Sequence, residues 1–158
     1  MTQPSRPDHT LQLDSYVPAL VNFLANKLSS GASRLYRRKF GVGIVEWRLL
    51  AMLKAENNIP PNRMCQVIGL DKAAVSRSLK QMHKEQLVTL QTDPTDARQM
   101  LVSLTASGQL MHDQIFELAI QREQLLLAEF SEQERTQLVD FLNRLNARVG
   151  AVNAFNPD

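Results

Sequence analysis

The feature that most constrains the fold is a pair of short helical segments separated by a glycine. Residues 62–68 and 72–85 both show helical spacing of their apolar residues, and Gly69 lies between them. Asp71 is placed to cap the second helix, because an aspartate side chain accepts hydrogen bonds from first-turn N–H groups. Two short helices joined by a glycine-containing turn predict a helix-turn-helix.

Directly after the second helix, the period of the apolar residues changes to two. Residues 87–90 and 100–104 each predict a short strand, with the polar turn Thr92–Asp96 between them. A hairpin at this point is a wing, which we place at 87–104. The predicted fold class is therefore mainly α with a small β-wing, with a winged helix-turn-helix over 44–108.

Longer helical patterns flank the winged segment. Apolar residues recur every three or four positions along about 15–40 and again along 109–150, and Thr105 is placed to cap a helix that runs to about Phe130. A single chain of 158 residues cannot easily cover these stripes around one small core, so we expect a helical dimerisation region. Residues 1–14 read as a short disordered tail.

Composition excludes a membrane protein. The chain is 44% hydrophobic but only 6% aromatic, which favours helices, and it lacks the run of about 20 apolar residues that a membrane span needs. The N-terminal residues do not follow the order of a signal peptide. Cys65 is the single cysteine, which suits a reducing cytoplasm, and we expect it to be a buried structural thiol.

The sequence contains no recognisable catalytic or metal-binding pattern. His9, His83 and His112 are scattered, without carboxylates or cysteines at metal-ligand spacing. The chain also lacks a glycine-rich phosphate loop and a nucleophile elbow. We therefore expect neither an enzyme nor a bound cofactor.

The outward face of the second short helix suits insertion into DNA. Ala73, Ser76, Arg77 and Lys80 share one face, and Lys72 precedes them at the N-terminal end that approaches base edges. Small residues allow close approach, while Arg77 can read guanine through paired donors. The opposite, core-facing side carries Val75, Leu79 and Met82. An exposed polar face without a partner is the alternative for an isolated helix, but the attached hairpin favours DNA.

The predicted wing carries a possible minor-groove contact. Arg98 lies at the tip, and an arginine there can enter a narrow minor groove, where the negative potential is strong. Asp96 is better explained as a support for Arg98, because DNA phosphates would repel a carboxylate. A surface ion pair between the two residues is the competing interpretation.

Charge is distributed unevenly along the chain. Residues 27–48 contain six Lys or Arg and one acid, whereas 109–158 contain four Arg and eight Asp or Glu. A basic segment is compatible with a nucleic-acid partner. A solvated helix face explains the same pattern equally well.

Several of these segments together resemble the MarR family of bacterial regulators, over roughly residues 15–148. The D-x-R wing followed by L-T-x-x-G is the most specific part. The resemblance is carried by Glu46–Leu50, Val75–Arg77, Leu79, Leu87–Val88, Asp93–Arg98 and Leu104–Gly108.

The resemblance implies an obligate homodimer whose two winged domains read successive major grooves of a pseudo-palindrome. It places Ser76, Arg77 and Lys80 on the recognition helix, 72–85, and Arg98 in the minor groove.

Two positions depart from the family pattern. Gln86 stands where a glycine is usual, which leaves the geometry of that turn open. Leu90 stands where an arginine is usual, so one basic contact or ion pair is missing.

The resemblance also implies a small-molecule effector, often an aromatic carboxylate or its coenzyme A thioester. The candidate lining residues are Arg34, Tyr36, Arg38, Trp47 and Arg48, since arginines pair with carboxylates or phosphates. Trp47 can equally be a core residue, and the arginines can equally hold DNA phosphates or a partner's acid.

The function predicted from these features is a homodimeric repressor that a small aromatic ligand releases from double-stranded DNA. Two alternatives remain at this point. One is a winged-helix module that binds protein, and the other is an oxidant-sensing regulator that responds through Cys65.

Overall fold

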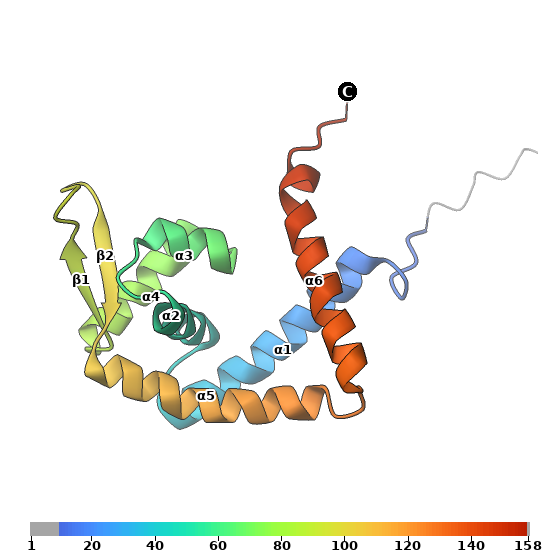
Figure 1. Cartoon of the computed structure of the whole chain (residues 1–158), viewed down its shortest axis with the longest axis horizontal. Helices are drawn as coiled ribbons and strands as arrows, with labels where there is room; N and C mark the ends of the chain where they lie inside the picture. Colours follow the sequence, from blue (N-terminus) through green and yellow to red (C-terminus); the bar gives the residue numbers. More distant parts are fainter. Residues whose placement is uncertain (1–9, 158) are drawn as a thin grey trace, which may run out of the picture. The chain divides into compact units, whose positions relative to one another are not determined.

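The computed structural model describes residues 10–157 and confirms a mostly helical fold with one small antiparallel sheet (Figure 1). The predicted tail 1–14 is covered only in part, because residues 1–9, which include His9, lie outside the described residues. In chain order the elements are α1 (Val17–Phe40), α2 (Ile44–Ala55), α3 (Pro61–Ile68), α4 (Lys72–Lys84), β1 (Val88–Thr92), β2 (Met100–Leu104), α5 (Ala106–Leu126) and α6 (Glu132–Asn153).

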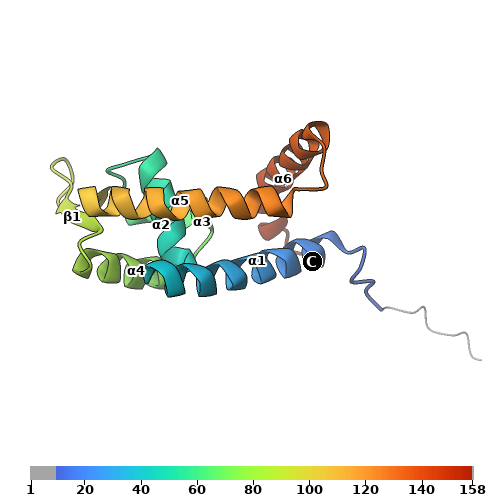
Figure 2. The same ribbon diagram turned by 90° about the horizontal axis from the view of Figure 1, so that it is seen from below.

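The helix α2 lies at the centre of the winged part of the molecule, packed against α3, α4 and β2 (Figures 1 and 2). Its side chains Leu49, Leu50 and Leu53 are completely buried. Met64 from α3 and Met82 from α4 are equally inaccessible to solvent. This small aliphatic core holds the two helices of the helix-turn-helix in place.

The two helices of the helix-turn-helix match their predicted bounds to within one residue: α3 begins at Pro61 rather than at 62, and α4 ends at Lys84 rather than at 85. Pro61 occupies the first position of α3, where a missing N–H costs little, and Gly69 ends the helix with a φ of 72°. The Asp71 carboxylate then accepts a hydrogen bond from the backbone N–H of Ala74, 2.8 Å away, and caps α4.

The wing has its predicted extent to within one residue, but its first strand ends later than predicted and it has a third strand-like partner. The first strand extends from Val88 to Thr92, two residues beyond the predicted end, because its last residues pair across with Leu101 and Met100. Ile59, in the connection before α3, forms an isolated bridge with Val102 through two backbone hydrogen bonds of 3.2 and 2.9 Å.

The wing is joined to α5 through a tight junction that explains the L-T-x-x-G pattern. The Thr105 hydroxyl donates to the Gln86 carbonyl (2.6 Å) and accepts from the backbone N–H of Gly108 (2.9 Å). A Cβ on Gly108 would overlap the Leu87 carbonyl oxygen, so only glycine fits. Gln86 itself has a φ of 59°, a left-handed conformation that glycine adopts more easily.

The C-terminal helices differ from the prediction at one boundary. We expected the helix after Thr105 to reach Phe130, but α5 ends at Leu126. Arg135 explains the early end, because its guanidinium donates to the carbonyl oxygens of Leu127 (2.8 Å) and Phe130 (3.1 Å). These contacts hold a turn, and α6 then starts after its N-cap, Ser131.

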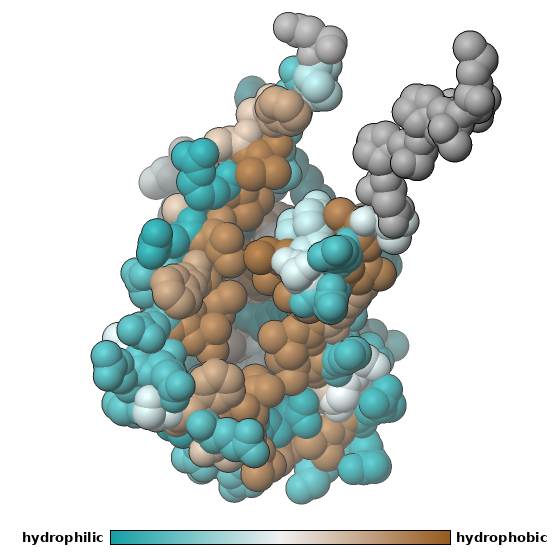
Figure 3. Space-filling model, turned by 90° about the vertical axis from the view of Figure 1, so that its right-hand side faces the viewer, coloured by the Kyte–Doolittle hydropathy of each residue, from teal (hydrophilic) through white to brown (hydrophobic). Residues whose placement is uncertain are grey.

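By their internal contacts, the residues fall into two compact units, one ending at Ile115 and the other beginning at Phe116. The helix α6 buries none of its residues, and many of its apolar side chains are about half exposed. In Figure 3 such side chains appear as brown patches, both on α1 near the grey N-terminal residues and along α6. Among the described residues, no helix is long and apolar enough to span a membrane.

Candidate nucleic-acid interface and effector cavity

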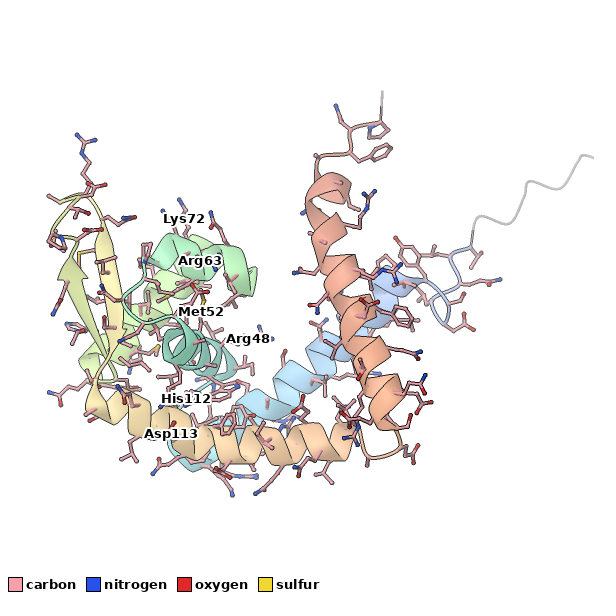
Figure 4. The ribbon with its side chains drawn as sticks, in the orientation of Figure 1. Arg48, Met52, Arg63, Lys72, His112 and Asp113 are labelled. Atoms are coloured by element: carbon pink, nitrogen blue, oxygen red, sulfur yellow. The ribbon has the colours of Figure 1, made fainter. Side chains whose placement is uncertain are left out.

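The helix α4 exposes every residue that the sequence placed on its DNA-facing side. Lys72, Ala73, Ser76, Arg77 and Lys80 are all exposed, and Figure 4 labels Lys72 at the start of this helix. The other side of the helix is buried and consists of Val75, Ser78, Leu79 and Met82. One face of α4 is thus available for a groove, while the other face fixes the helix to the core. Whether these five residues contact DNA stays a prediction.

A part-buried polar contact, which the sequence did not reveal, fixes α4 to α2. The Ser78 hydroxyl donates to one carboxylate oxygen of Glu46 at 2.7 Å, and the other oxygen accepts the backbone N–H of Gly43 at 3.0 Å. Glu46 therefore caps its own helix and orients the recognition helix at once. The available signal was a serine among the apolar core positions of α4.

The wing loop is organised by the carboxylate of Asp93. One of its oxygens accepts both the hydroxyl and the backbone N–H of Thr95, each at 2.7 Å. These hydrogen bonds favour the ionised form, so the Thr95 hydroxyl above all holds the pKa of Asp93 below its usual value. The loop is therefore held in a defined shape by short-range hydrogen bonds rather than by a core.

Asp96 supports Arg98 through the backbone. Its carboxylate accepts the backbone N–H of Arg98 at 3.0 Å. Among residues 10–157, no ion pair joins Asp96 to the Arg98 guanidinium. Asp96 thus shapes the turn that presents Arg98, and the exposed Arg98 side chain projects from the loop. The surface ion pair considered from the sequence does not form.

Three aromatic rings connect α1, α2 and α5. The Trp47 ring stacks on His112, with centroids 5.3 Å apart, and meets the buried Tyr36 edge-on at 6.1 Å. The Asp113 carboxylate is 2.8 Å from Nδ1 of His112 and 3.1 Å from Nζ of Lys54. These two groups, His112 foremost, lower the pKa of Asp113. Figure 4 labels His112 and Asp113 on α5.

An open cavity of about 520 Å³ lies between α2 and α3. Arg48, one of its two charged residues, donates a hydrogen bond from Nη2 to the Ser29 hydroxyl at 2.9 Å, which orients the guanidinium. Figure 4 labels Arg48 and Met52 along α2. The residues that line the cavity are Trp47, Arg48, Ala51, Met52, Ala55, Glu56, Val67 and Ile68.

The structure brings together only part of the residue set that the family resemblance suggested for an effector. Trp47 and Arg48 line the cavity, and Tyr36 is buried against Trp47. Arg34 and Arg38 are exposed on α1 and do not line this cavity; Arg34 donates instead to Ser30. The helix α3 supplies a wall that the sequence did not suggest.

Cys65 is only partly buried, so the expectation of a buried thiol was wrong. The helix α3 is short, and it turns Met64 rather than Cys65 into the core. Sequence spacing could not separate these adjacent positions, because both are apolar. Among the described residues, no cluster of three or more metal-ligating side chains is present.

Comparison with known proteins assigns the family. A model of the MarR family matches residues 40–99. A crystal structure of a MarR/EmrR family transcriptional regulator from Acinetobacter sp. ADP1 is 35% identical with a TM-score of 0.83, covering 89% of this chain and 99% of that one. The chain belongs to the MarR family.

Two further comparisons agree with this assignment. The HTH-type transcriptional regulator YdgJ of Bacillus subtilis (strain 168) is 29% identical over 117 residues, which cover 72% of this chain and 70% of YdgJ. A MarR family regulator from Silicibacter pomeroyi shares the fold, with a TM-score of 0.77 at 22% identity, covering 87% of this chain and 92% of that one.

Membership in the MarR family makes this chain a DNA-binding regulator of transcription. The MarR proteins that it resembles are regulators rather than enzymes. The structure also resolves what the departure at Gln86 means for the MarR fold. Gln86 adopts the left-handed conformation that the family's usual glycine adopts readily, so the wing keeps its junction with α5.

Proposed function

We propose that this MarR protein acts in the cytoplasm as a homodimeric repressor, which a small aromatic acid releases from a pseudo-palindromic operator. The observation that carries the proposal is the exposed face of α4, whose opposite side is fixed to the core by Ser78 and Glu46. A rigid helix with a free polar face is what major-groove recognition requires.

The proposed DNA contacts divide into two kinds. Arg77 reads a base edge through paired donors, and the Ser76 hydroxyl reaches a base or a phosphate. Ala73 allows close approach, while Lys72 and Lys80 bind phosphates. Arg98 enters the minor groove from the wing loop, which Asp96 holds in shape. In a two-fold dimer the two recognition helices would lie about 34 Å apart, one turn of DNA.

The exposed apolar residues of the terminal helices support the homodimer. Apolar patches of this extent mark association surfaces in soluble proteins. An open cavity of about 550 Å³ between the end of α5 and the start of α6, whose lining includes four leucines and a valine, gives a second chain a surface to pack into. The most exposed apolar side chains of α6 are Val139, Phe141, Leu142, Leu145, Val149 and Val152.

Arg77→Ala tests the DNA contact. If Arg77 reads a base, the substitution costs about 1–3 kcal/mol of binding free energy and relaxes preference at one operator position.

Arg98→Ala should weaken binding with little change in major-groove preference. Affinity for duplex DNA is measured as a function of salt, whose slope reports the phosphates neutralised. Arg148→Ala, on α6, is the matched control. Unchanged affinity in Arg77→Ala would overturn the assignment of α4.

The effector part of the proposal rests on the cavity between α2 and α3. Arg48 is oriented by Ser29 to pair with a carboxylate, and the flat Trp47 ring and apolar side chains suit an aromatic body. Calorimetric titration with aromatic acids and their coenzyme A thioesters tests this. An affinity that disappears in Arg48→Ala supports the site; absence of binding by every compound refutes the ligand class.

A further inference from the structure

One ion pair of the winged unit connects the end of α2 to the beginning of α3. Arg63, the third residue of α3, donates from Nε and Nη2 to the two carboxylate oxygens of Glu56, at 3.1 and 2.9 Å. This bidentate pairing lowers the pKa of Glu56 and raises the pKa of Arg63, chiefly through its hydrogen bonds. Both side chains are about half exposed (47%), so the pair contributes little to stability by itself.

Glu56 belongs to the ion pair and to the cavity at the same time. It lines the cavity between α2 and α3, whose other charged residue is Arg48. The two residues are eight positions apart, which is about 12 Å along a helix axis. A ligand that lies along α2 therefore meets a guanidinium at one end and a carboxylate at the other. The side chains between them are mostly apolar.

The geometry makes the ion pair the closing contact of a short loop. The connection between α2 and α3 is already fixed to β2, because Ile59 bridges Val102 and the Asn57 side chain accepts the backbone N–H of Leu104 at 2.9 Å. The pair between Glu56 and Arg63 adds the remaining tie, at the first turn of α3. Because α3 packs against α4, the tie bears on the helix that faces DNA. Figure 4 labels Arg63 on α3 and Met52 on the neighbouring α2.

We propose that the Glu56–Arg63 pair is the latch through which an occupant of the cavity lowers DNA affinity. The inference rests on the proposed function. Its occupant is an aryl-alkanoic acid that carries a ring hydroxyl, with the carboxylate on Arg48, the ring against Trp47 and the hydroxyl donating to Glu56. A donor from the ligand competes with Arg63 for the carboxylate oxygens. Arg63 is then released, and α3 loses its tie to α2. Glu56 is thus a positioning residue and not a DNA contact.

Substitutions on both sides of the pair separate a tie from a simple charge effect. Glu56→Gln removes a negative charge and Arg63→Gln a positive one, so charge alone would raise DNA affinity in the first and lower it in the second. A tie predicts that both lower the affinity, by about threefold to tenfold. The exchanged pair Glu56→Arg with Arg63→Glu should restore it to within about twofold. Asp140→Asn, which breaks an exposed ion pair with Arg144 on α6, is the control and should change nothing.

The release step is tested with two acids that differ in one hydroxyl. Trp47 is the single tryptophan and lines the cavity, so its fluorescence reports occupancy without DNA. Both 3-(4-hydroxyphenyl)propanoate and 3-phenylpropanoate should change this fluorescence. The hydroxylated acid should lower DNA affinity at least about fivefold more than the other acid at equal occupancy, and Glu56→Gln should abolish that difference.

The possible results distinguish failure of the latch from failure of the proposed function. Opposite shifts of DNA affinity in the two single variants, or no rescue by the exchanged pair, overturn the latch even if the acids bind. Equal effects of both acids at equal occupancy overturn the role of Glu56 in release. Unchanged Trp47 fluorescence with both acids refutes the effector class, and wild-type protein that does not bind duplex DNA refutes the proposed repressor.

Discussion

The winged unit (residues 44–108) buries its main apolar side chains, whereas the helix α6 leaves its apolar side chains exposed. In the winged unit, Leu49, Leu50 and Leu53 of α2 are completely buried by neighbours from the same chain. In α6, Leu142 and Leu145 remain 47% and 46% exposed although the helix is fully formed. Fully burying such a side chain is worth about 1.5–3 kcal/mol, so α6 leaves a large stabilisation unused within one chain.

The difference separates two kinds of information in one sequence. The winged unit carries its own core, and its residues specify a structure that one chain can complete. The apolar stripe on α6 specifies a helix but not the surface that packs against it, so the stability of α6 depends on what binds to that stripe. We therefore expect substitutions in the winged unit to change unfolding directly, and substitutions on α6 to change association first.

The same substitution at two glycines gives the largest contrast between the regions. Gly108→Ala places a methyl group on the Leu87 carbonyl oxygen, so the junction of the wing with α5 must shift. We expect a loss of about 3 kcal/mol in the free energy of unfolding, measured with denaturant. Gly150→Ala is the control. It meets no atom within 4 Å in α6, and alanine in a helix should gain about 0.5–1 kcal/mol.

A destabilising Gly150→Ala would break the comparison. It would mean that this part of α6 is closely covered in the assembled protein. Unchanged stability of Gly108→Ala would show that the junction has room that its geometry does not show.

A charge in the stripe of α6 is expected to affect association most. Leu142→Glu places a carboxylate where the proposed dimer buries a leucine, and should raise the dimer dissociation constant by about a hundredfold. Analytical ultracentrifugation over a range of concentrations measures it. Val67→Glu, a similarly exposed position (53%) of the winged unit, should leave the dimer intact. Equal behaviour of the two variants would refute the assignment of α6 to the interface.

Two serines of α4 separate the core-facing side of the winged unit from its DNA-facing side. Ser78→Ala removes the hydrogen bond to the Glu46 carboxylate and should cost about 1.5 kcal/mol of unfolding free energy. Ser76→Ala, on the exposed face, should change stability by less than about 0.5 kcal/mol but weaken DNA binding. Thermal unfolding and DNA titration of both variants test this assignment. If Ser78→Ala weakened DNA binding and Ser76→Ala lowered stability, the face of α4 that contacts DNA would be the one that carries Ser78.

The smallest expected effect is that of acid pH on the hydrogen bonds of the wing loop. The pKa of Asp93 is lowered in the folded protein, so its contribution is complete above the ordinary carboxyl pKa and is lost as pH falls through the lower folded value. The backbone amide of Thr95 should therefore keep its protection from hydrogen exchange until strongly acid pH. NMR titration of the Asp93 carboxyl and the Thr95 amide measures this, and Asp93→Asn should show no transition. A carboxyl that titrates at its ordinary pKa would contradict the hydrogen bonds of the loop.

Local signals were sufficient to predict the winged unit. Gly69 and Asp71 lie at the helix boundaries that glycine and aspartate favour, and the change to a period of two located the wing. These features depend on neighbours within a few residues, so a single sequence contains them. The separation of exposed from buried positions on α4 followed for the same reason, since helical geometry alone sets it.

Contacts between distant residues were not predictable in this way. Glu46 and Ser78 are 32 positions apart, and nothing in their spacing indicates that they meet. The bridge from Ile59 to Val102 depends on how the connection lies against the hairpin. The cavity was not predicted for the same reason. Part of its lining comes from α3, whose residues the sequence alone assigns only to a helix-turn-helix.

The way in which the wing is anchored has a mechanical consequence. Its base is held on one side by Ile59 and on the other by Thr105, whereas the loop at 93–99 is shaped only by its own hydrogen bonds. The hairpin is therefore fixed at its base and free at the loop that carries Arg98. A force applied at Arg98 would bend the strands about that fixed base, which lies next to the first turn of α5.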